Sequence, residues 1–175
     1  MHACQAGEGF CVDGRLVIQC RRKDAIRIGK HVQINSRFLS NLVGLSNPAV
    51  LCCYDEGRIE IGDHTGISSA IISSRTKIVI GRHVNIGGNA RIFDHDFHSM
   101  KAPDRRDGQT DRLNCKSAPV IIGDDVFIGT NSIILKGVRI GDRSVIGAGA
   151  VVSIRDIPAD SIVVGNPARI INVEQ

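Results

Sequence analysis

The chain has 175 residues, of which 42% are hydrophobic and 23% are charged, a balance that suits one soluble domain with a continuous core. It contains no tryptophan, one tyrosine and five phenylalanines, so that core must be aliphatic. The formal net charge of +4 suits a phosphate-bearing small molecule as ligand. Nucleic acid is disfavoured, because the basic residues form no dense run and no aromatic residues are interleaved with them.

The sequence indicates neither a membrane span nor an oxidising environment. No run of about 18 apolar residues occurs, so any membrane association is expected to depend on partners. The six cysteines form no CxxC pair, and no secretory leader is visible. These features predict a cytoplasmic protein with reduced thiols.

An aliphatic residue recurs at every sixth position over much of the chain. The uninterrupted series is Ile122, Ile128, Ile134, Ile140, Ile146 and Val152. The same spacing joins Ile28 to Ile34, Ile61 to Ile67, and Ile80 to Ile86 and Ile92. A period of six matches neither an amphipathic helix nor a hairpin sheet. It predicts a three-sided parallel β-helix, in which three repeats make one coil and the aliphatic residues stack inward about 4.8 Å apart.

Small or turn-forming residues follow the leading aliphatic residue, as expected at the corners of such a coil. His31, His64 and His83 each come three positions after it and are interpreted as turn residues. The repeats predict one β-helix domain over residues 1–175. Residues 1–27 are expected to form an N-terminal cap or lead-in, and residues 164–175 the C-terminal end.

The repeat is broken twice, at residues 40–58 and at residues 93–121. The second break begins with a DHDFH segment at residues 94–98. An imidazole with an ordinary pKa of about 6.5 can accept a proton at neutral pH, and a neighbouring carboxylate can orient it. From the residues alone, the segment could be part of a catalytic loop, a solvated charged loop or a metal site.

Five stretches make the chain resemble a known enzyme family. They lie at residues 59–63, 94–98, 118–131, 146–150 and 164–169. Over roughly residues 59–171 the chain is similar to the hexapeptide-repeat acyltransferases, in the branch that contains galactoside, maltose, nodulation-factor, capsule and lipopolysaccharide O-acetyltransferases. The resemblance implies an all-β fold, a left-handed parallel β-helix with an inserted catalytic loop at 93–121. It also implies a homotrimer with active sites between neighbouring subunits, acetyl-CoA as donor, and no metal.

The resemblance also implies catalytic roles. His95 falls at the position of the general base, which takes the proton of an acceptor hydroxyl as its oxygen attacks the thioester, without an acyl-enzyme. Asp94 and Asp96 are equal candidates to orient His95. The backbone amide of Thr130 is the expected oxyanion donor. Cys115 lies in the loop but is interpreted as a bystander.

The donor is expected to lie along the regular coils. The residues implied by the resemblance are Gly129, Thr130, Gly147, Ala148, Ser153, Arg155, Asn166, Pro167 and Arg169. Ser153 and Arg155 match only if Ile154 is counted as an extra residue, and Asn172 stands where relatives often have a second basic residue. Ser69 and His98 are the expected acceptor contacts, and each also has a simpler interpretation as a coil-surface or solvated residue.

The expected function is acetyl-CoA-dependent O-acetylation of a sugar or glycan precursor, as in polysaccharide biosynthesis. One alternative is N-acetylation of an amino-sugar nucleotide, because a histidine base serves both reactions. Another is a zinc enzyme resembling γ-class carbonic anhydrases, with His83, His95 and His98 as ligands. A third is a trimeric scaffold without catalytic activity.

Overall fold

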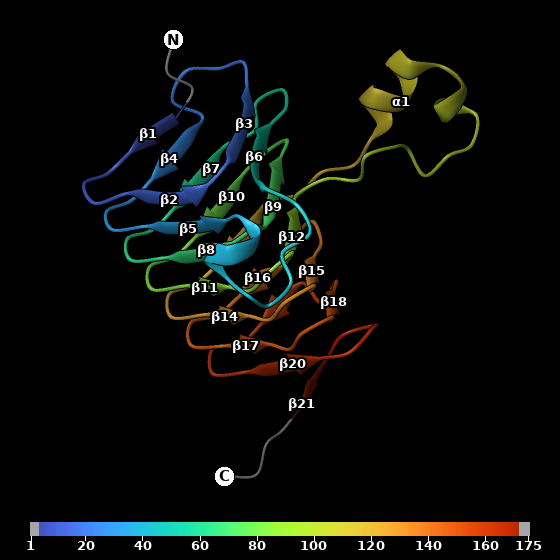
Figure 1. Cartoon of the computed structure of the whole chain (residues 1–175). Helices are drawn as coiled ribbons and strands as arrows, with labels where there is room; N and C mark the ends of the chain where they lie inside the picture. Colours follow the sequence, from blue (N-terminus) through green and yellow to red (C-terminus); the bar gives the residue numbers. More distant parts are fainter. Residues whose placement is uncertain (1–3, 172–175) are drawn as a thin grey trace.

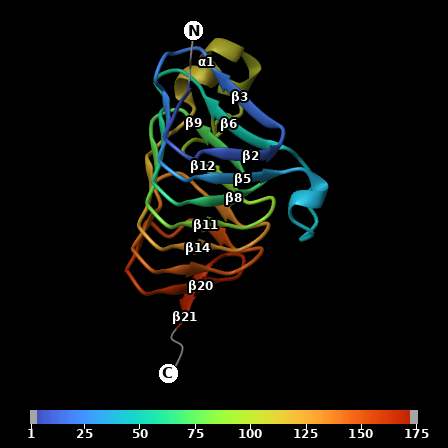
Figure 2. The same ribbon diagram turned by 60° about the vertical axis from the view of Figure 1, so that its left-hand side comes forward.

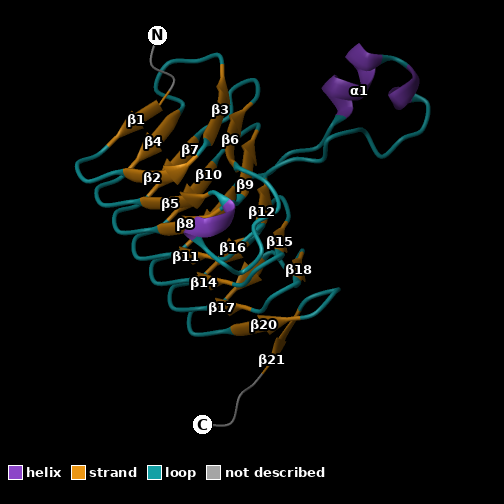
Figure 3. Ribbon diagram, in the orientation of Figure 1, coloured by secondary structure: helices purple, strands orange, loops and turns teal. Residues whose placement is uncertain are grey.

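The computed structural model describes residues 4–171 as a coil of three parallel sheets, here called A, B and C (Figures 1 and 3). Sheet A contains β1 (Cys4–Ala6), β4 (Ile26–Ile28), β7 (Ile59–Ile61), β10 (Ile78–Ile80), β13 (Val120–Ile122), β16 (Arg139–Ile140) and β19 (Asp156–Ile157). Sheet B contains β2 (Cys11–Gly14), β5 (Gln33–Ser36), β8 (Gly66–Ser68), β11 (Asn85–Ile86), β14 (Phe127–Ile128), β17 (Val145–Ile146), β20 (Ile162–Val164) and β21 (Arg169–Ile171). Sheet C contains β3 (Leu16–Cys20), β6 (Ala49–Cys53), β9 (Ile71–Ser74), β12 (Arg91–Phe93), β15 (Ile133–Ile134) and β18 (Val151–Val152).

Each coil adds one strand to each sheet, so neighbouring strands in a sheet come from successive coils. The described strand pairs are parallel except for β20 with β21, where the chain reverses. The chain turns at an AB corner, a BC corner and a CA corner, each named after the two sheets that it joins. The predicted parallel β-helix is therefore confirmed.

The leading aliphatic residues of the repeat stack in registered columns inside the coil. In sheet A one column runs through Ile28, Ile61, Ile80, Ile122, Ile140 and Ile157. All six are buried, and burying such a side chain contributes about 1.5–3 kcal/mol. The six-residue spacing thus reflects one inward-facing side chain on each side of the coil.

Truncating one side chain of this column should strongly destabilise the fold. Ile80→Ala should lower the free energy of unfolding by about 2–5 kcal/mol, because Ile80 is 1% exposed and the neighbouring coils cannot close the gap. Val79→Ala, one position away and only partly buried, is the matched control. Urea unfolding at one fixed protein concentration measures both, and equal losses would contradict the assignment of the inward face.

The AB corner has the backbone conformation expected of turn residues. His31, His64 and His83 have φ values of 54°, 59° and 56°, and their rings stack with centroids 5.0 and 4.9 Å apart. The preceding glycines allow close approach of adjacent coils, since a Cβ on Gly62 would lie 2.5 Å from the backbone of Gly81. The interpretation of these histidines as turn residues is confirmed.

The first predicted break is shorter than expected. Only the segment between β5 and β6 leaves the coil, and it contains the short 3-10 helix η1 (Phe38–Ser40). Within residues 49–53, β6 is a regular strand whose Leu51 pairs with Ile72 in the inward column. Leu51 and the next leading residue, Ile61, are separated by ten positions instead of six, so the six-residue count does not continue from β6 to β7. Ahead of the recognisable repeats, residues 4–20 supply the first strand of each sheet.

The second break is an inserted loop between β12 and β13. It contains a short 3-10 helix, η2 (Asp104–Arg106), and the helix α1 (Gly108–Asn114). Asp107 begins α1 by accepting a hydrogen bond from the Thr110 amide at 2.8 Å. Figures 1 and 2 show the loop leaving the coil and reaching toward the N-terminal coils. Neither α1 nor any other helix in the described part of the chain is long and apolar enough to cross a membrane.

Candidate active site

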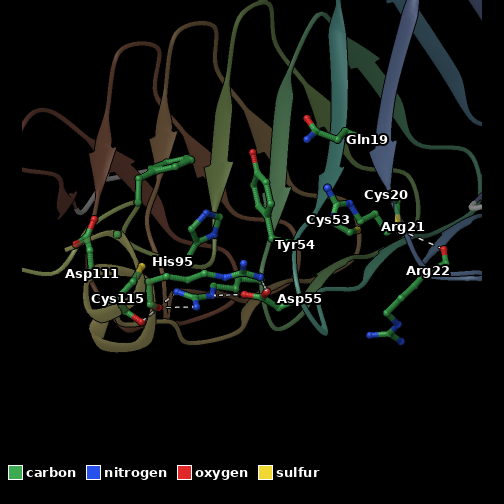
Figure 4. Close-up of a pocket in the computed structure, with 14 residues that line it drawn as sticks. Gln19, Cys20, Arg21, Arg22, Cys53, Tyr54, Asp55, His95, Asp111 and Cys115 are labelled. Carbon is green, nitrogen blue, oxygen red and sulfur yellow. Dashed lines mark hydrogen bonds and ion pairs between the residues drawn. The ribbon is translucent and has the colours of Figure 1, made fainter. Parts of the chain in front are cut away.

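Four side chains from successive coils form a column at the CA corner. Arg21, Tyr54 and Arg75 directly follow β3, β6 and β9. His95 continues the column, because β12 pairs with β9 in a register that carries His95 opposite Arg75. All four line a cavity of about 500 Å³, here called the first cavity, and the inserted loop supplies its opposite wall (Figure 4).

His95 is held by a buried carboxylate. Asp94 accepts a hydrogen bond from His95 Nδ1 at 3.0 Å, and the two residues are 0% and 6% exposed. The same carboxylate accepts from Ser74 Oγ at 2.8 Å and from the Arg75 amide at 2.7 Å. The Thr76 amide and hydroxyl add bonds of 2.8 and 2.9 Å. Burial alone would raise the pKa of Asp94, but the hydrogen bonds from His95 and the other donors outweigh it and lower that pKa.

This arrangement defines which nitrogen of His95 is free to react. An ionised carboxylate can only accept, so the proton lies on Nδ1 and Nε2 carries the lone pair. The ring packs against Tyr54 and Phe97, with centroid distances of 5.9 and 4.6 Å. His95 lines both the first cavity and a second one of about 450 Å³. Nε2 of His95, which can accept a proton, therefore belongs to a residue that lies where the two cavities meet.

Asp96, the other residue considered for orienting His95, has a different partner. Its carboxylate accepts from Lys136 Nζ at 2.6 Å, and its amide donates to the Lys116 carbonyl at 2.8 Å. The backbone at this corner aims successive side chains in different directions. The structure therefore brings Asp94, and not Asp96, to the imidazole.

The second cavity is lined mainly by apolar side chains. They are Phe93, Phe97, Met100, Ile133 and Leu135. His98 also lines it, and its Nδ1 lies 2.6 Å from Asp111 Oδ2 while Asp111 Oδ1 accepts from the Ser99 amide. His98 thus helps to hold the inserted loop in shape at the edge of this cavity.

Ion pairs fasten the inserted loop to the coil inside the first cavity. Asp55 binds Arg112 of α1 and also accepts from Arg75 Nε at 2.7 Å. Arg75 in turn donates to the Arg112 carbonyl at 2.7 Å. Hydrogen bonds from Arg112 and then Arg75 lower the pKa of Asp55. These residues were not predicted from the sequence, although Tyr54 and Arg75 each directly follow a strand of sheet C.

Three thiols line the first cavity, namely those of Cys20, Cys53 and Cys115. Burial, followed by the neighbouring Cys20 thiol, raises the pKa of Cys53 to about 12. Cys53 is therefore protonated at neutral pH and is a poor nucleophile. Cys115 directs its thiol at the backbone carbonyl of Asp96.

The predicted donor residues fall at two different corners. At the BC corner lie Gly129, Thr130, Gly147 and Ala148, and Asn166 and Pro167 lie in the turn between β20 and β21. At the CA corner lie Ser153 and Arg155, and Arg169 begins β21. Ala148 and Gly149 are exposed, and a Cβ added to Gly149 would meet nothing within 4 Å, so backbone is open to a ligand there. Asn172 lies outside the described residues.

The predicted oxyanion donor, Thr130, and the predicted acceptor contact Ser69 both lie at the BC corner. Thr130 donates its hydroxyl to the Gly88 carbonyl at 2.6 Å, and no residue in 4–171 accepts a hydrogen bond from its amide. Thr130 lines neither cavity. Ser69 is 0% exposed and its hydroxyl donates to the Asn35 carbonyl at 3.3 Å. A side chain without exposure cannot contact an acceptor, so Ser69 is assigned a structural role at the corner.

The three histidines considered as zinc ligands do not converge in one chain. His83 lies at the AB corner, whereas His95 and His98 lie beyond the CA end of β12. Across residues 4–171, no three histidine, cysteine or carboxylate side chains are grouped so as to hold a metal ion.

Comparisons with known proteins agree with the repeat and the fold. The family model described as the hexapeptide repeat of succinyl-transferase matches residues 119–153. A 2,3,4,5-tetrahydropyridine-2,6-dicarboxylate N-acetyltransferase from Staphylococcus aureus is 51% identical over 55 residues, which are 31% of this chain. The match spans only 23% of the length of that enzyme.

Two solved structures are similar over nearly the whole chain. A hexapeptide-repeat-containing acetyltransferase from Vibrio cholerae is 29% identical, with a TM-score of 0.62, over 95% of this chain and 71% of that one. The N-acyltransferase AntD from Bacillus cereus, in complex with dTDP-4-amino-4,6-dideoxyglucose and coenzyme A, is 23% identical. Its TM-score is 0.75, over 99% of this chain and 84% of AntD.

The repeat, the coil and these neighbours define a hexapeptide-repeat protein with a left-handed parallel β-helix. More particularly, the resemblance of the chain to the hexapeptide-repeat acyltransferases is confirmed.

Proposed function

We propose that this protein is an acetyl-CoA-dependent acyltransferase that acetylates a sugar-related acceptor with His95 as general base. The observation that carries the proposal is the buried Asp94–His95 pair at the junction of two cavities. Its place in the inserted loop of a hexapeptide-repeat fold, and the acetyltransferase activity named for the Vibrio cholerae and Staphylococcus aureus proteins, support it.

The chemistry follows from the geometry of the pair. Asp94 keeps the Nδ1 proton in place and stabilises the imidazolium that forms. Nε2 of His95 takes the proton of the acceptor hydroxyl or amine as its oxygen or nitrogen attacks the thioester carbonyl. The tetrahedral intermediate then collapses, the carbon–sulfur bond breaks, and the imidazolium returns its proton to the departing thiolate. No covalent acyl-enzyme is needed, in keeping with the raised pKa of Cys53.

We further propose that each active site is completed by a neighbouring copy in a homotrimer. His95 follows the end of β12, whereas Thr130 precedes β15, the strand that pairs with β12. The base and the free amide therefore lie at opposite ends of sheet C within one chain. Bringing both to one thioester requires the CA corner of one copy to face the BC corner of the next.

Mixing two inactive variants tests this shared site. His95→Ala removes the base, and Ala148→Trp covers the exposed backbone proposed to bind the donor. Each alone should be inactive, but purified mixed trimers should recover about a third of wild-type activity, because one of their three interfaces carries both intact halves. Co-expression with two purification tags supplies the mixed species. No recovery in verified mixed trimers would indicate that one chain supplies both halves.

The proposed activity is tested by thiol release from acetyl-CoA with a panel of monosaccharides, oligosaccharides and amino-sugar nucleotides. Succinyl-CoA should be run beside acetyl-CoA, since the matching repeat model is described for succinyl-transferase. Acceptor-dependent thiol release and a product heavier by one acetyl group are expected. If no acceptor in the panel raises thiol release above background, the proposed activity is not supported.

N-acetylation of an amino-sugar nucleotide is the second candidate, favoured by the likeness to AntD and the cationic residues of the first cavity. The product separates the two reactions. Hydroxylamine cleaves an O-acetyl ester and leaves an N-acetyl amide intact.

A further inference from the structure

The first cavity carries more positive than negative charge. Its basic side chains are those of Arg21, Arg22, Arg75 and Arg112, and its acidic ones are those of Asp55 and Asp111. Pairing with Asp55 satisfies two of the arginines, Arg75 and Arg112. The remaining acid, Asp111, faces His98. The remaining arginines, Arg21 and Arg22, therefore provide the excess positive charge.

These two arginines lie at the end of the cavity formed by β3. Among residues 4–171, the acidic partner of Arg22 is Glu56, whose side chain is 85% exposed, so water weakens that ion pair. Within the described part of the chain, Arg21 has no acidic partner and its side chain lines the cavity (Figure 4). A cation that lines a cavity and lacks a protein partner is available to an anionic ligand.

The length of the column limits which ligands can contact both Arg21 and His95. Arg21 and His95 are three coils apart, which corresponds to about 14 Å between their Cα atoms. Tyr54 lies between them, and its ring is nearly perpendicular to that of His95, with the two centroids 5.9 Å apart. This path offers an aromatic surface for a sugar ring between the cationic end and the base. A free monosaccharide would leave the arginine end without a partner.

We infer that the first cavity binds an acceptor sugar linked to a diphosphate, with the phosphates on Arg21 and Arg22 and the sugar near Tyr54. This inference rests on the proposed function, since it places the reacting hydroxyl or amine at Nε2 of His95. The planar guanidinium of arginine matches phosphate oxygens through paired N–H groups. Its position directly after a strand of the coil helps to fix the site before the ligand arrives.

Binding of thymidine diphosphate and of inorganic pyrophosphate, measured by titration calorimetry on the full chain, tests the site without any transfer reaction. Arg21→Gln should weaken binding of both probes by about tenfold or more, because a charge-assisted hydrogen bond to phosphate is lost. Arg21→Lys keeps the charge and should retain part of the affinity. Arg27→Gln, an exposed residue of β4 outside the cavity, is the matched control and should bind as wild type does.

The outcomes separate this inference from the proposed function. If the wild-type protein acetylates neutral sugars but binds neither probe, the diphosphate site is wrong and the acyltransferase proposal stands. If both probes bind through Arg21 but no acceptor is acetylated, the site stands and the activity is wrong. Equal affinities for wild type and Arg21→Gln, with unchanged thermal stability, would overturn the assignment of Arg21.

Discussion

Replacing His95 with alanine should lower turnover by about 10²–10⁴-fold on any acceptor that the wild-type protein acetylates. The variant removes the imidazole that we propose as the proton acceptor where the two cavities meet. Binding of acetyl-CoA should change little, because none of the proposed donor residues lines either of the two cavities that His95 lines. Thiol release under saturating acceptor measures turnover, and calorimetry with coenzyme A measures binding.

His83→Ala is the matched control for this variant. It removes an imidazole of the same size from the exposed AB corner and should leave turnover near that of wild type. A circular dichroism melt of both variants checks that they fold. Wild-type turnover in His95→Ala would show that the base is wrongly assigned.

Asp94→Asn should lower turnover by about 10²–10⁴-fold while the volume of the side chain is kept. The new amide group must face at least one of the donors that the carboxylate now accepts from, among them His95 Nδ1 and the Arg75 amide. The imidazole then loses the partner that holds its proton on Nδ1. Asp96→Asn, which breaks only the pair with Lys136, should have a smaller effect on turnover.

The same substitution should change how stability depends on pH. The pKa of Asp94 is lowered below 3.8 in the folded chain, so the charged carboxylate stabilises the fold above the pKa of the unfolded chain. That contribution is lost as the pH falls through the folded pKa. The difference in free energy of unfolding between wild type and Asp94→Asn should be constant from about pH 7 to 5 and shrink below about pH 4. A difference that grows in acid would contradict the lowered pKa.

The coil was predictable because its signal is local. An inward side chain recurs at every sixth position wherever strand and corner have constant length, as from Ile122 to Val152. β6 escaped detection because Leu51 and Ile61, the next leading residue of the repeat, are ten positions apart, four more than the regular six. Leu51 still fills the inward position of β6, but a count of one aliphatic residue at every sixth position does not find it.

Which of Asp94 and Asp96 orients His95 could not be predicted from the sequence, for a different reason. Both flank His95 in the sequence, and alternation along a strand does not apply at a corner whose backbone path is unknown. Donors from Ser74, Arg75 and Thr76 on the preceding coil surround Asp94. Those donors are about twenty residues away, so no motif around His95 contains them.

By itself, the sequence determined the three-sided coil, the resemblance to hexapeptide-repeat acyltransferases and the histidine to examine, because each depends on spacing or on a short motif. Only the tertiary structure decided that Arg21, Tyr54 and Arg75 share a column with His95, and that Thr130 lies at the opposite end of sheet C. The reason is physical: residues in one column come from different coils, separated by turns of unequal length. Their proximity is set by strand register, which the chain defines only when it has folded.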